Sequence, residues 1–334
     1  MKAGVVDMFR RLSIFYSVKR EPYRALTYKR AADVVEKMSG PEYAEFLEII
    51  KKWSEGREGR EGREGRRASG PVGLPPGLGK SCAERVLEFL ELGQDAPAAV
   101  NEVTKAWNNF IAIRGAGPAK VVEWINAGYR TYEDLLASAS LTPQQSLWLK
   151  YRAGLSERIS RRDIEALYEK IVRAADFPMT LAGSYRRGAE SSGDVDIVCR
   201  ASGSAFSAFC EKVKGLGGFS GYFSAGAVMA SAVFEYEKVW EPAEGPAEGP
   251  PERGAVSVDF IRCSEKEYPT ALLYFTGDAL HNVWMRGLAK KMGMELNASG
   301  LWKGSKRVAA KSEEDIYQAL GIEYVAPADR VGAP

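Results

Sequence analysis

The chain has 334 residues, of which 45% are apolar and 27% charged, and its formal net charge is +2. These values are ordinary for a folded protein of two or more domains, while a single histidine, His281, and four dispersed cysteines exclude a histidine-rich metal centre and a disulfide framework. No apolar run approaches the roughly 18 residues of a membrane span and the N-terminus lacks a signal peptide's apolar core, so we expect an intracellular protein, nuclear in a eukaryote, with no membrane partner.

Helical periodicity comes first along the chain and strand-like alternation follows. Apolar residues recur at helical spacing over 5–18, 26–37, 83–92, 119–127, 161–174 and 279–292. Alternating or β-branched runs predict strands over 195–200, 231–236 and 256–261. Helices followed by a mixed half predict a multidomain protein, with an α domain followed by an α+β domain.

Two segments of biased composition interrupt this order. Residues 54–71 repeat Glu-Gly-Arg, and glycine at every third position predicts a flexible loop rather than a helix. Residues 237–254 contain the repeat EGPAEGP, and since proline cannot donate to a ladder, we predict a loop between two strands.

Two G-x-G hairpins each precede a predicted helix. The residues concerned are Gly77, Gly79 and Lys80 in the first hairpin and Gly115, Gly117 and Lys120 in the second. Such a turn exposes backbone N–H groups at a helix N-terminus, where they hold a phosphate oxygen without reading a base. Its carbonyls suit a monovalent cation such as Na⁺ or K⁺. One such turn is weak evidence against a plain helix–helix connection, but two copies favour helix-hairpin-helix binding of a DNA backbone.

Three aspartates form the densest chemical signal. Asp194 and Asp196 are separated by one residue on a predicted strand, so their side chains lie on the same face. Asp259 sits in a later strand. Close carboxylates repel one another unless a cation lies between them, and oxygen ligands suit Mg²⁺. Two Mg²⁺ ions, with Mn²⁺ able to substitute, would activate an attacking hydroxyl and steady a leaving pyrophosphate. The segment 193–196 alone would equally fit an exposed turn and an edge strand.

A glycine turn lies eleven residues before the first aspartate. Gly183 and Ser184 begin a turn into a helical segment, and their N–H groups and hydroxyl suit a triphosphate. Arg187 adds a cationic donor, whereas we expect Arg186 to anchor the turn. Turn and aspartates together predict a nucleotidyltransferase.

The run GSYRRGAESSGDVDIV at 183–198 resembles the catalytic motif of the family X DNA polymerases. The resemblance is strongest to the beta-type members of this family. The resemblance extends over most of the chain, including YKRAA at 28–32, both hairpins, LYFTG at 273–277 and SEEDIY at 312–317. It implies a helical lyase-like DNA-binding domain with helix-hairpin-helix motifs at 1–97, a helix-hairpin-helix subdomain at 98–153, a catalytic palm with a nucleotidyltransferase-type sheet at 154–263, and a nucleotide-selection subdomain at 264–334.

The resemblance also implies roles for single residues. Asp194, Asp196 and Asp259 would be the metal-binding catalytic triad, with Asp259 activating the primer 3′-hydroxyl. Nucleotide contacts would come from Gly183, Ser184, Arg187, Gly193, Tyr274, Phe275, Gly277 and Asn282. Template DNA would be contacted by Arg286, which shares a helix face with Asn282, and a 5′-phosphate by Arg24, Tyr28 and Lys80.

Several positions depart from the family pattern. Arg85 stands where the family's lyase lysine is expected, and a guanidinium is a poor amine nucleophile, so we expect 5′-deoxyribose phosphate lyase activity to be absent or strongly reduced unless Lys80 substitutes. Ser257 stands in place of an arginine beside the catalytic carboxylate, and we expect weaker nucleotide affinity or looser closure. We expect His281 to lie on the surface or to make a minor DNA contact, and not to bind metal.

The leading interpretation is a template-directed DNA polymerase that fills gaps in base excision repair. It would be monomeric, bind gapped or primer-template DNA and dNTPs, and have repair proteins as further partners. A template-independent terminal transferase would share every metal residue, and the lack of a long insertion before Leu272 favours template direction. A DNA-binding scaffold without strong catalysis fits the intact triad poorly. The DNA-binding hairpins disfavour a transferase acting on RNA or small molecules.

Overall fold

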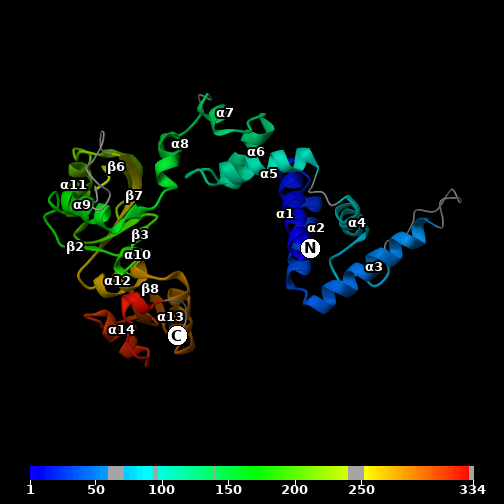
Figure 1. Cartoon of the computed structure of the whole chain (residues 1–334). Coiled ribbons are helices and arrows are strands. Elements are labelled where there is room, and N and C mark those ends of the chain that lie inside the picture. Colours follow the sequence, from blue (N-terminus) through cyan, green and yellow to red (C-terminus); the bar gives the residue numbers. More distant parts are fainter. Residues whose placement is uncertain (59–70, 93–96, 138–139, 240–251, 331–334) are drawn as a thin grey trace, which may run out of the picture. The chain divides into compact units, whose positions relative to one another are not determined.

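The chain divides into two units, Met1–Leu141 and Thr142–Pro334. The computed structural model describes residues 1–58, 71–92, 97–137, 140–239 and 252–330 (Figure 1). The first unit is helical and the second combines helices with sheets, so the predicted order of an α part before a mixed part is confirmed. Among the described helices, none is both long and apolar enough to cross a lipid bilayer.

The first unit consists of seven helices in the described residues. They are α1 (Lys2–Val18), α2 (Pro22–Lys37), α3 (Gly40–Glu58), α4 (Lys80–Leu92), α5 (Ala98–Ile111), α6 (Pro118–Asn126) and α7 (Tyr132–Leu136). Helices α1 to α4 share a core that includes Phe9, Val35, Phe46 and Val86. Polar contacts join the later helices to α1, because the Asn126 amide donates to the Val18 carbonyl at 3.0 Å.

The predicted loop over 54–71 is wrong at its beginning, because α3 continues to Glu58. Phe46 and Ile50 are buried and Trp53 packs against the same core, at the helical spacing of four and three residues. Burial of this stripe carries the helix past the point where the glycine repeat begins. The rest of the predicted loop, 59–70, lies outside the described residues.

A five-stranded sheet forms the centre of the second unit. Its strands are β2 (Met179–Leu181), β4 (Val195–Arg200), β5 (Phe219–Ala225), β6 (Met229–Glu237) and β7 (Arg253–Cys263), in the spatial order β2-β4-β7-β6-β5. β4 and β7 are parallel, and the other neighbours are antiparallel. All three predicted strands are confirmed. A separate two-stranded pair joins β1 (Ile159–Ser160) to β3 (Ser191–Ser192).

The two faces of this sheet have different roles. Helices α9 (Arg161–Val172) and α11 (Gly203–Val213) cover one face, where Ile197, Ala232, Val258 and Phe260 belong to one core (Figure 1). Because side chains alternate along a strand, residues at the intervening positions of β4, β6 and β7 point to the opposite face. The two strand aspartates occupy such positions.

The predicted loop over 237–254 is wrong at both ends. Glu237 pairs with Arg253 and Tyr236 with Gly254, so the ladder between β6 and β7 extends into the predicted loop. At Gly254 an added Cβ would lie 2.4 Å from the Tyr236 ring, so glycine lets the aromatic side chain pack across the strand. The proline repeat at 240–251 lies outside the described residues.

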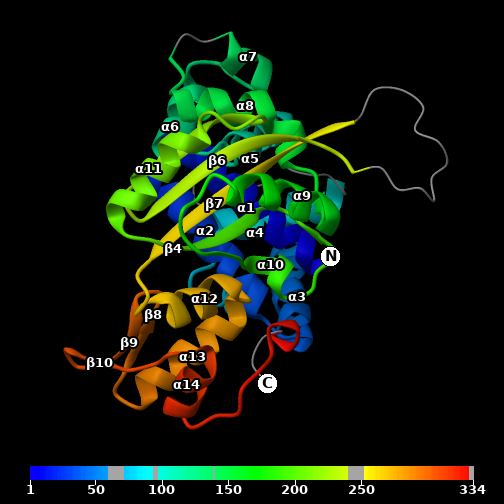
Figure 2. The ribbon, with the colours of Figure 1, turned by 90° about the vertical axis from the view of Figure 1, so that its left-hand side faces the viewer.

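The C-terminal part of the second unit forms its own core. It contains α12 (Tyr268–Thr276), α13 (Ala279–Lys291), β8 (Glu295–Asn297), β9 (Gly300–Lys303), β10 (Lys306–Val308) and α14 (Glu313–Ala319). Leu273, Met285, Leu301 and Ile316 belong to this core. In Figure 2 these elements, coloured orange to red, gather below the large sheet.

Helix α8 (Pro143–Leu155) is the first helix of the second unit, and most of it also falls within the predicted subdomain at 98–153. Leu147, Trp148 and Tyr151 on α8 pack against a cluster containing Val233 and Ala255. Burial against β6 and β7 therefore ties α8 to the large sheet.

Candidate active site

Two of the three predicted carboxylates are direct neighbours in the large sheet. The parallel register of β4 and β7 places Asp196 beside Asp259. Asp194 is exposed and lies one residue before β4 begins. Residues far apart in the sequence are thus brought to one face, as the alternation pattern predicts.

The electrostatic state of Asp196 reflects this crowding. Its burial raises the pKa, the charges of Asp194 and Asp259 raise it further, and Arg187 lowers it, with a result of about 7. The neighbouring carboxylates thus disfavour the ionisation of Asp196, and a cation among them would favour it. The all-oxygen donor set fits a hard divalent ion such as Mg²⁺.

The carboxylates do not already form a closed ligand cage. In the part of the chain that the structure describes, no three His, Cys, Asp or Glu side chains converge closely enough to hold a metal ion. The Ser231 hydroxyl donates a hydrogen bond to Oδ1 of Asp259, so this side chain is held by its neighbour strand.

The predicted phosphate-binding turn approaches Asp196 closely. Helix α10 (Gly183–Arg186) begins at Gly183, whose φ is +54°. A Cβ at this residue would lie 2.3 Å from Oδ2 of Asp196. Ser184 follows, and its hydroxyl donates to Ser192 at 2.7 Å. Gly193 is exposed beside the acidic group. Only glycine therefore permits the turn and the carboxylate to be this close.

Replacing Gly183 with alanine is expected to displace Asp196 and to lower turnover by about 100-fold. Gly188→Ala is the matched control, since Gly188 also has a positive φ, +84°, but its added Cβ would meet nothing within 4 Å. Both variants carry the same kind of backbone strain, so thermal unfolding should shift similarly. Equal loss of activity in the two variants would contradict the close approach as the cause.

Arg186 and Arg187 both connect the turn to the C-terminal core. The Arg187 side chain donates to the Thr276 carbonyl oxygen. Arg186 donates to the Thr276 hydroxyl at 2.8 Å and to both carboxylate oxygens of Glu313 at 2.9 and 2.7 Å. The prediction that Arg186 anchors the turn is confirmed. In this conformation Arg187 also makes a protein contact.

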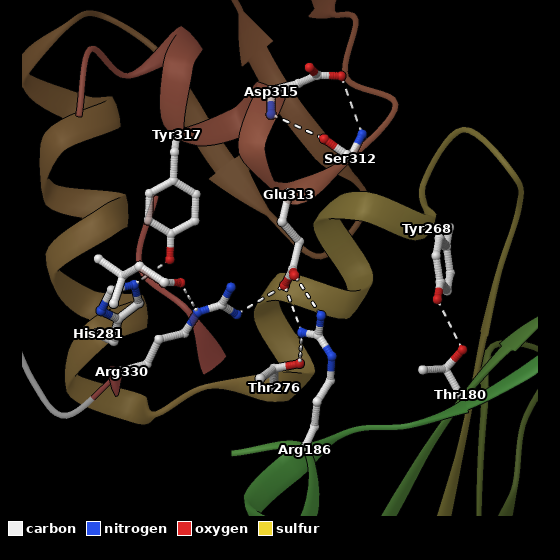
Figure 3. A network of polar contacts seen from close by, with 11 residues as sticks. Thr180, Arg186, Tyr268, Thr276, His281, Ser312, Glu313, Asp315, Tyr317 and Arg330 are labelled. Atoms are coloured by element: carbon white, nitrogen blue, oxygen red, sulfur yellow. Dashed lines mark hydrogen bonds and ion pairs between the residues drawn. The ribbon is translucent and has the colours of Figure 1, made fainter. Parts of the chain in front are cut away.

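A buried charge network extends from Arg186 (Figure 3). Glu313 also accepts a hydrogen bond from Arg330 at 2.9 Å, and Arg330 has no exposed surface. Burial would raise the pKa of Glu313, but the hydrogen bonds from both arginines bring it below its usual value. The His281 ring is hydrogen-bonded to the Tyr317 hydroxyl at 2.8 Å and is fully buried. The expectation of a surface His281 is wrong, because its face of α13 packs against α14.

The predicted nucleotide-contacting residues gather beside α12 and α13. The rings of Tyr274 and Phe275 lie 5.1 Å apart, nearly perpendicular, and the Asn282 amide donates to the Tyr274 carbonyl at 2.7 Å. Arg286 is exposed one helical turn later, and its Nε donates to the Asn282 carbonyl at 3.2 Å. Gly277, with φ of +69°, ends α12. A cavity of about 760 Å³ is bordered by Tyr274, Phe275, Arg286, Lys290, Met294, Glu295, Leu296, Asn297 and Ala298.

The residues predicted to contact a 5′-phosphate differ in how far their side chains are exposed to solvent. Arg24 is exposed and pairs with Glu21 at 2.9 Å, whereas Tyr28 is buried and stacks on Tyr16 with 5.5 Å between ring centroids. Lys80 begins α4, 3.8 Å from Glu84. Of these predicted contacts, Arg24 and Lys80 are the more accessible.

Contacts with Glu88 and Tyr28 keep the Arg85 side chain protonated. Its Nη1 lies 2.5 Å from Glu88, and its side chain also bonds to Tyr28. Burial would lower the pKa of Arg85, but the bonds to Glu88 and Tyr28 raise it above its usual value. The guanidinium therefore offers no unprotonated amine.

The glycine hairpins adopt tight turns. Gly77 and Gly115 have φ of +94° and +84°. The second hairpin joins α5 to α6, and Gly117 is the N-cap of α6. Gly79 directly precedes α4, and Lys120 pairs with Glu123 at 2.7 Å. Both predicted positions before a helix are confirmed.

Sequence reasoning missed several side chains of the site. Ser231 contacts Asp259 and Glu313 contacts Arg186 across 28 and 127 positions of the chain, and Arg330 contacts Glu313 across 17. Only Glu313 carried a local signal, since it follows Ser312, which caps α14 in a reciprocal pair with Asp315.

Comparison with known proteins adds a family likeness. The chain matches the models of the fingers domain of DNA polymerase lambda over residues 108–155, the DNA polymerase beta palm over 158–215 and the DNA polymerase beta thumb over 271–331. It is 28% identical to DNA polymerase lambda of Rattus norvegicus, covering 94% of this chain and 54% of that protein. DNA polymerase lambda of Arabidopsis thaliana is 24% identical, covering 99% and 62%. DNA-directed DNA/RNA polymerase mu of Homo sapiens is 28% identical, covering 76% and 59%. The chain thus spans little more than half the length of the curated relatives it matches.

Proposed function

We infer that this chain, which belongs to the family X DNA polymerases, extends a primer 3′-hydroxyl with dNTPs along a DNA template and fills short gaps in DNA repair. The single observation that carries this is the placement of Asp196 beside Asp259, with the Gly183 turn against Asp196. The carboxylates and the phosphate-binding turn thus lie together at one place on the sheet. A polymerase needs both there.

The acidic group would hold two Mg²⁺ ions through Asp194, Asp196 and Asp259, and Mn²⁺ would be able to replace them. When bound, these ions lower the pKa of the primer hydroxyl and neutralise charge on the pyrophosphate that leaves. Asp259 is the carboxylate that we assign to the primer hydroxyl, as the resemblance to the family's catalytic motif implies; it lies between Asp196 and Ser231 in the sheet. One nucleotide is added and one pyrophosphate is released at each step.

The incoming nucleotide would lie between the turn and α12. Gly183, Ser184 and Gly193 would contact the triphosphate, joined by Arg187 once it exchanges the Thr276 carbonyl for a phosphate oxygen. The sugar and base would meet Tyr274, Phe275, Gly277 and Asn282, which border or adjoin the cavity beside α13. Arg286 would reach the template strand, since its side chain is exposed at the same cavity.

The DNA backbone would be held by the two glycine hairpins. Each presents N–H groups at a helix N-terminus, and their carbonyls would coordinate a Na⁺ or K⁺ ion. We assign 1–97 to a lyase-like DNA-binding domain, 98–153 to a helix-hairpin-helix subdomain, 154–263 to the palm and 264–334 to nucleotide selection. The chain would act as a monomer, together with other repair proteins.

The lyase reaction is expected to be missing. With DNA that carries a 5′-deoxyribose phosphate, borohydride should trap no covalent adduct, because Arg85 stays protonated and cannot form a Schiff base. Binding of the 5′-phosphate, through Arg24 and Lys80, should remain. Adduct formation that disappears in Lys80→Ala would show instead that Lys80 is the nucleophile.

Template dependence is the experiment that tests the proposed function. The chain is given each dNTP singly with one-nucleotide-gapped DNA and, separately, with the same primer as a single strand. The proposal predicts addition of the complementary nucleotide to the gapped DNA alone. Addition to the single strand, without regard to sequence, would identify a terminal transferase. Binding without extension would leave a DNA-binding scaffold.

A further inference from the structure

Ser231 lies directly opposite Asp259 on the neighbouring strand. β6 and β7 are antiparallel, and their register matches Ser231 with Asp259. Ser231 is 0% exposed, and its Oγ donates a hydrogen bond to Oδ1 of Asp259. A serine hydroxyl has a single proton to donate, and here that proton is directed to the carboxylate assigned to the primer hydroxyl.

A second serine supports the first. Ser257 lies two residues before Asp259 on β7, so it points to the same face, and its Oγ is 3.5 Å from Oγ of Ser231. Because Ser231 gives its proton to Asp259, Ser257 has to be the donor in this longer contact. The Ser257 hydroxyl thus adds a long, weak contact to Ser231, which itself donates to Asp259.

We propose that Ser231 is a positioning residue for Asp259, with Ser257 as its support. By holding Oδ1, the Ser231 hydroxyl fixes the rotation of the carboxylate and therefore the direction in which Oδ2 faces. The buried β6–β7 ladder makes this bond rigid, since Ser231 has no exposed surface. This inference rests on the proposed function, because the orientation of the Asp259 carboxylate matters only if Asp259 binds metal and acts on the primer hydroxyl.

The test compares Ser231→Ala, Ser231→Thr and Ser257→Ala with the unaltered full chain. Thr180→Val is the matched control, since it removes a hydroxyl of the same sheet whose partner is Tyr268. Single-turnover gap filling gives the maximal rate and the apparent dNTP affinity. Electron paramagnetic resonance of free Mn²⁺ measures metal binding in the complex with dideoxy-terminated gapped DNA and dNTP, independently of turnover.

Ser231→Ala is expected to lower the maximal rate and the Mn²⁺ affinity, by about 10- to 100-fold in either or both, with dNTP and DNA affinity unchanged. Ser231→Thr should restore most of the loss, because it keeps the hydroxyl. Ser257→Ala should show a smaller loss of the same kind. Thr180→Val should match the unaltered chain.

Unaltered rate and Mn²⁺ affinity in Ser231→Ala would overturn the proposal. So would a loss that Ser231→Thr does not restore although that variant melts normally, since the role would then be one of packing. If Ser231→Ala does not fold, Ser257→Ala decides, and its unchanged rate overturns the proposal. An unaltered chain that extends no primer refutes the proposed function instead, which separates the two failures.

Discussion

Asp259→Ala is expected to lower nucleotide addition by about 10²- to 10⁴-fold while leaving affinity for gapped DNA unchanged. Asp259 lies beside Asp196 on the parallel strand and opposite Ser231 on the antiparallel one. On the proposed function, its removal takes away a metal ligand and the carboxylate assigned to the primer hydroxyl. It also relieves one of the charges that raise the pKa of Asp196. DNA contacts through the hairpins do not involve it.

Single-turnover extension and fluorescence anisotropy with labelled gapped DNA measure the two quantities. Asp176→Ala is the matched control, since Asp176 is an exposed carboxylate of the same unit that pairs with Lys212 at 2.5 Å. The control should extend primers normally. Parallel loss of DNA binding and extension in Asp259→Ala, together with a lower melting temperature, would mean that Asp259 has a structural role.

Glu313→Ala is expected to destabilise the second unit by about 3–5 kcal/mol, because it leaves the buried Arg330 and the half-buried Arg186 without their shared counter-charge. Glu313 is 5% exposed and accepts bonds from Arg186 and Arg330. Arg186 also anchors the turn that begins at Gly183, so activity should fall with stability. Glu314→Ala, at an exposed position of the same helix, is the control and should change little.

The sign of the pH dependence follows from the lowered pKa of Glu313. Because the pKa of Glu313 is lower in the folded state, its ionised form stabilises the fold at pH values above its unfolded-state pKa of about 4.3. This stabilisation is lost as the pH falls through the folded-state pKa. Urea unfolding at pH 7 and at a series of acid values measures it. Glu313→Ala should lack this acid-side decline. An unchanged unfolding free energy at pH 7 would contradict the role of Glu313.

Local patterns in the sequence predicted six of the helices, three strands of the large sheet and the shared face of its two aspartates. The period-two spacing of Asp196 and the β-branched run around Asp259 were enough to expect a shared face, and the parallel register confirms it. The turn at Gly183 was also predicted, because Gly183 and Ser184 lead from an apolar stretch into a helical segment. Its 2.3 Å constraint against Asp196, however, follows only from the folded backbone.

Contacts between distant segments could not be predicted. The bond between Arg186 and Glu313 spans 127 positions, and each residue alone looks like a surface charge. His281 likewise has no histidine or cysteine near it in the sequence, yet its helix face is buried against Tyr317. The end of α3 was missed because burial of Phe46 and Ile50 outweighs the low helix propensity of the glycine repeat. Tertiary packing decided each of these cases.

The most direct test of the central claim is single-turnover filling of a one-nucleotide gap in Mg²⁺, with extended primer and released pyrophosphate measured together. The account predicts one pyrophosphate for each nucleotide added, insertion of the nucleotide complementary to the template base, and loss of both products in Asp259→Ala. Absence of extension in both Mg²⁺ and Mn²⁺, with gapped DNA still bound, would contradict the claim that this acidic group is a polymerase active site.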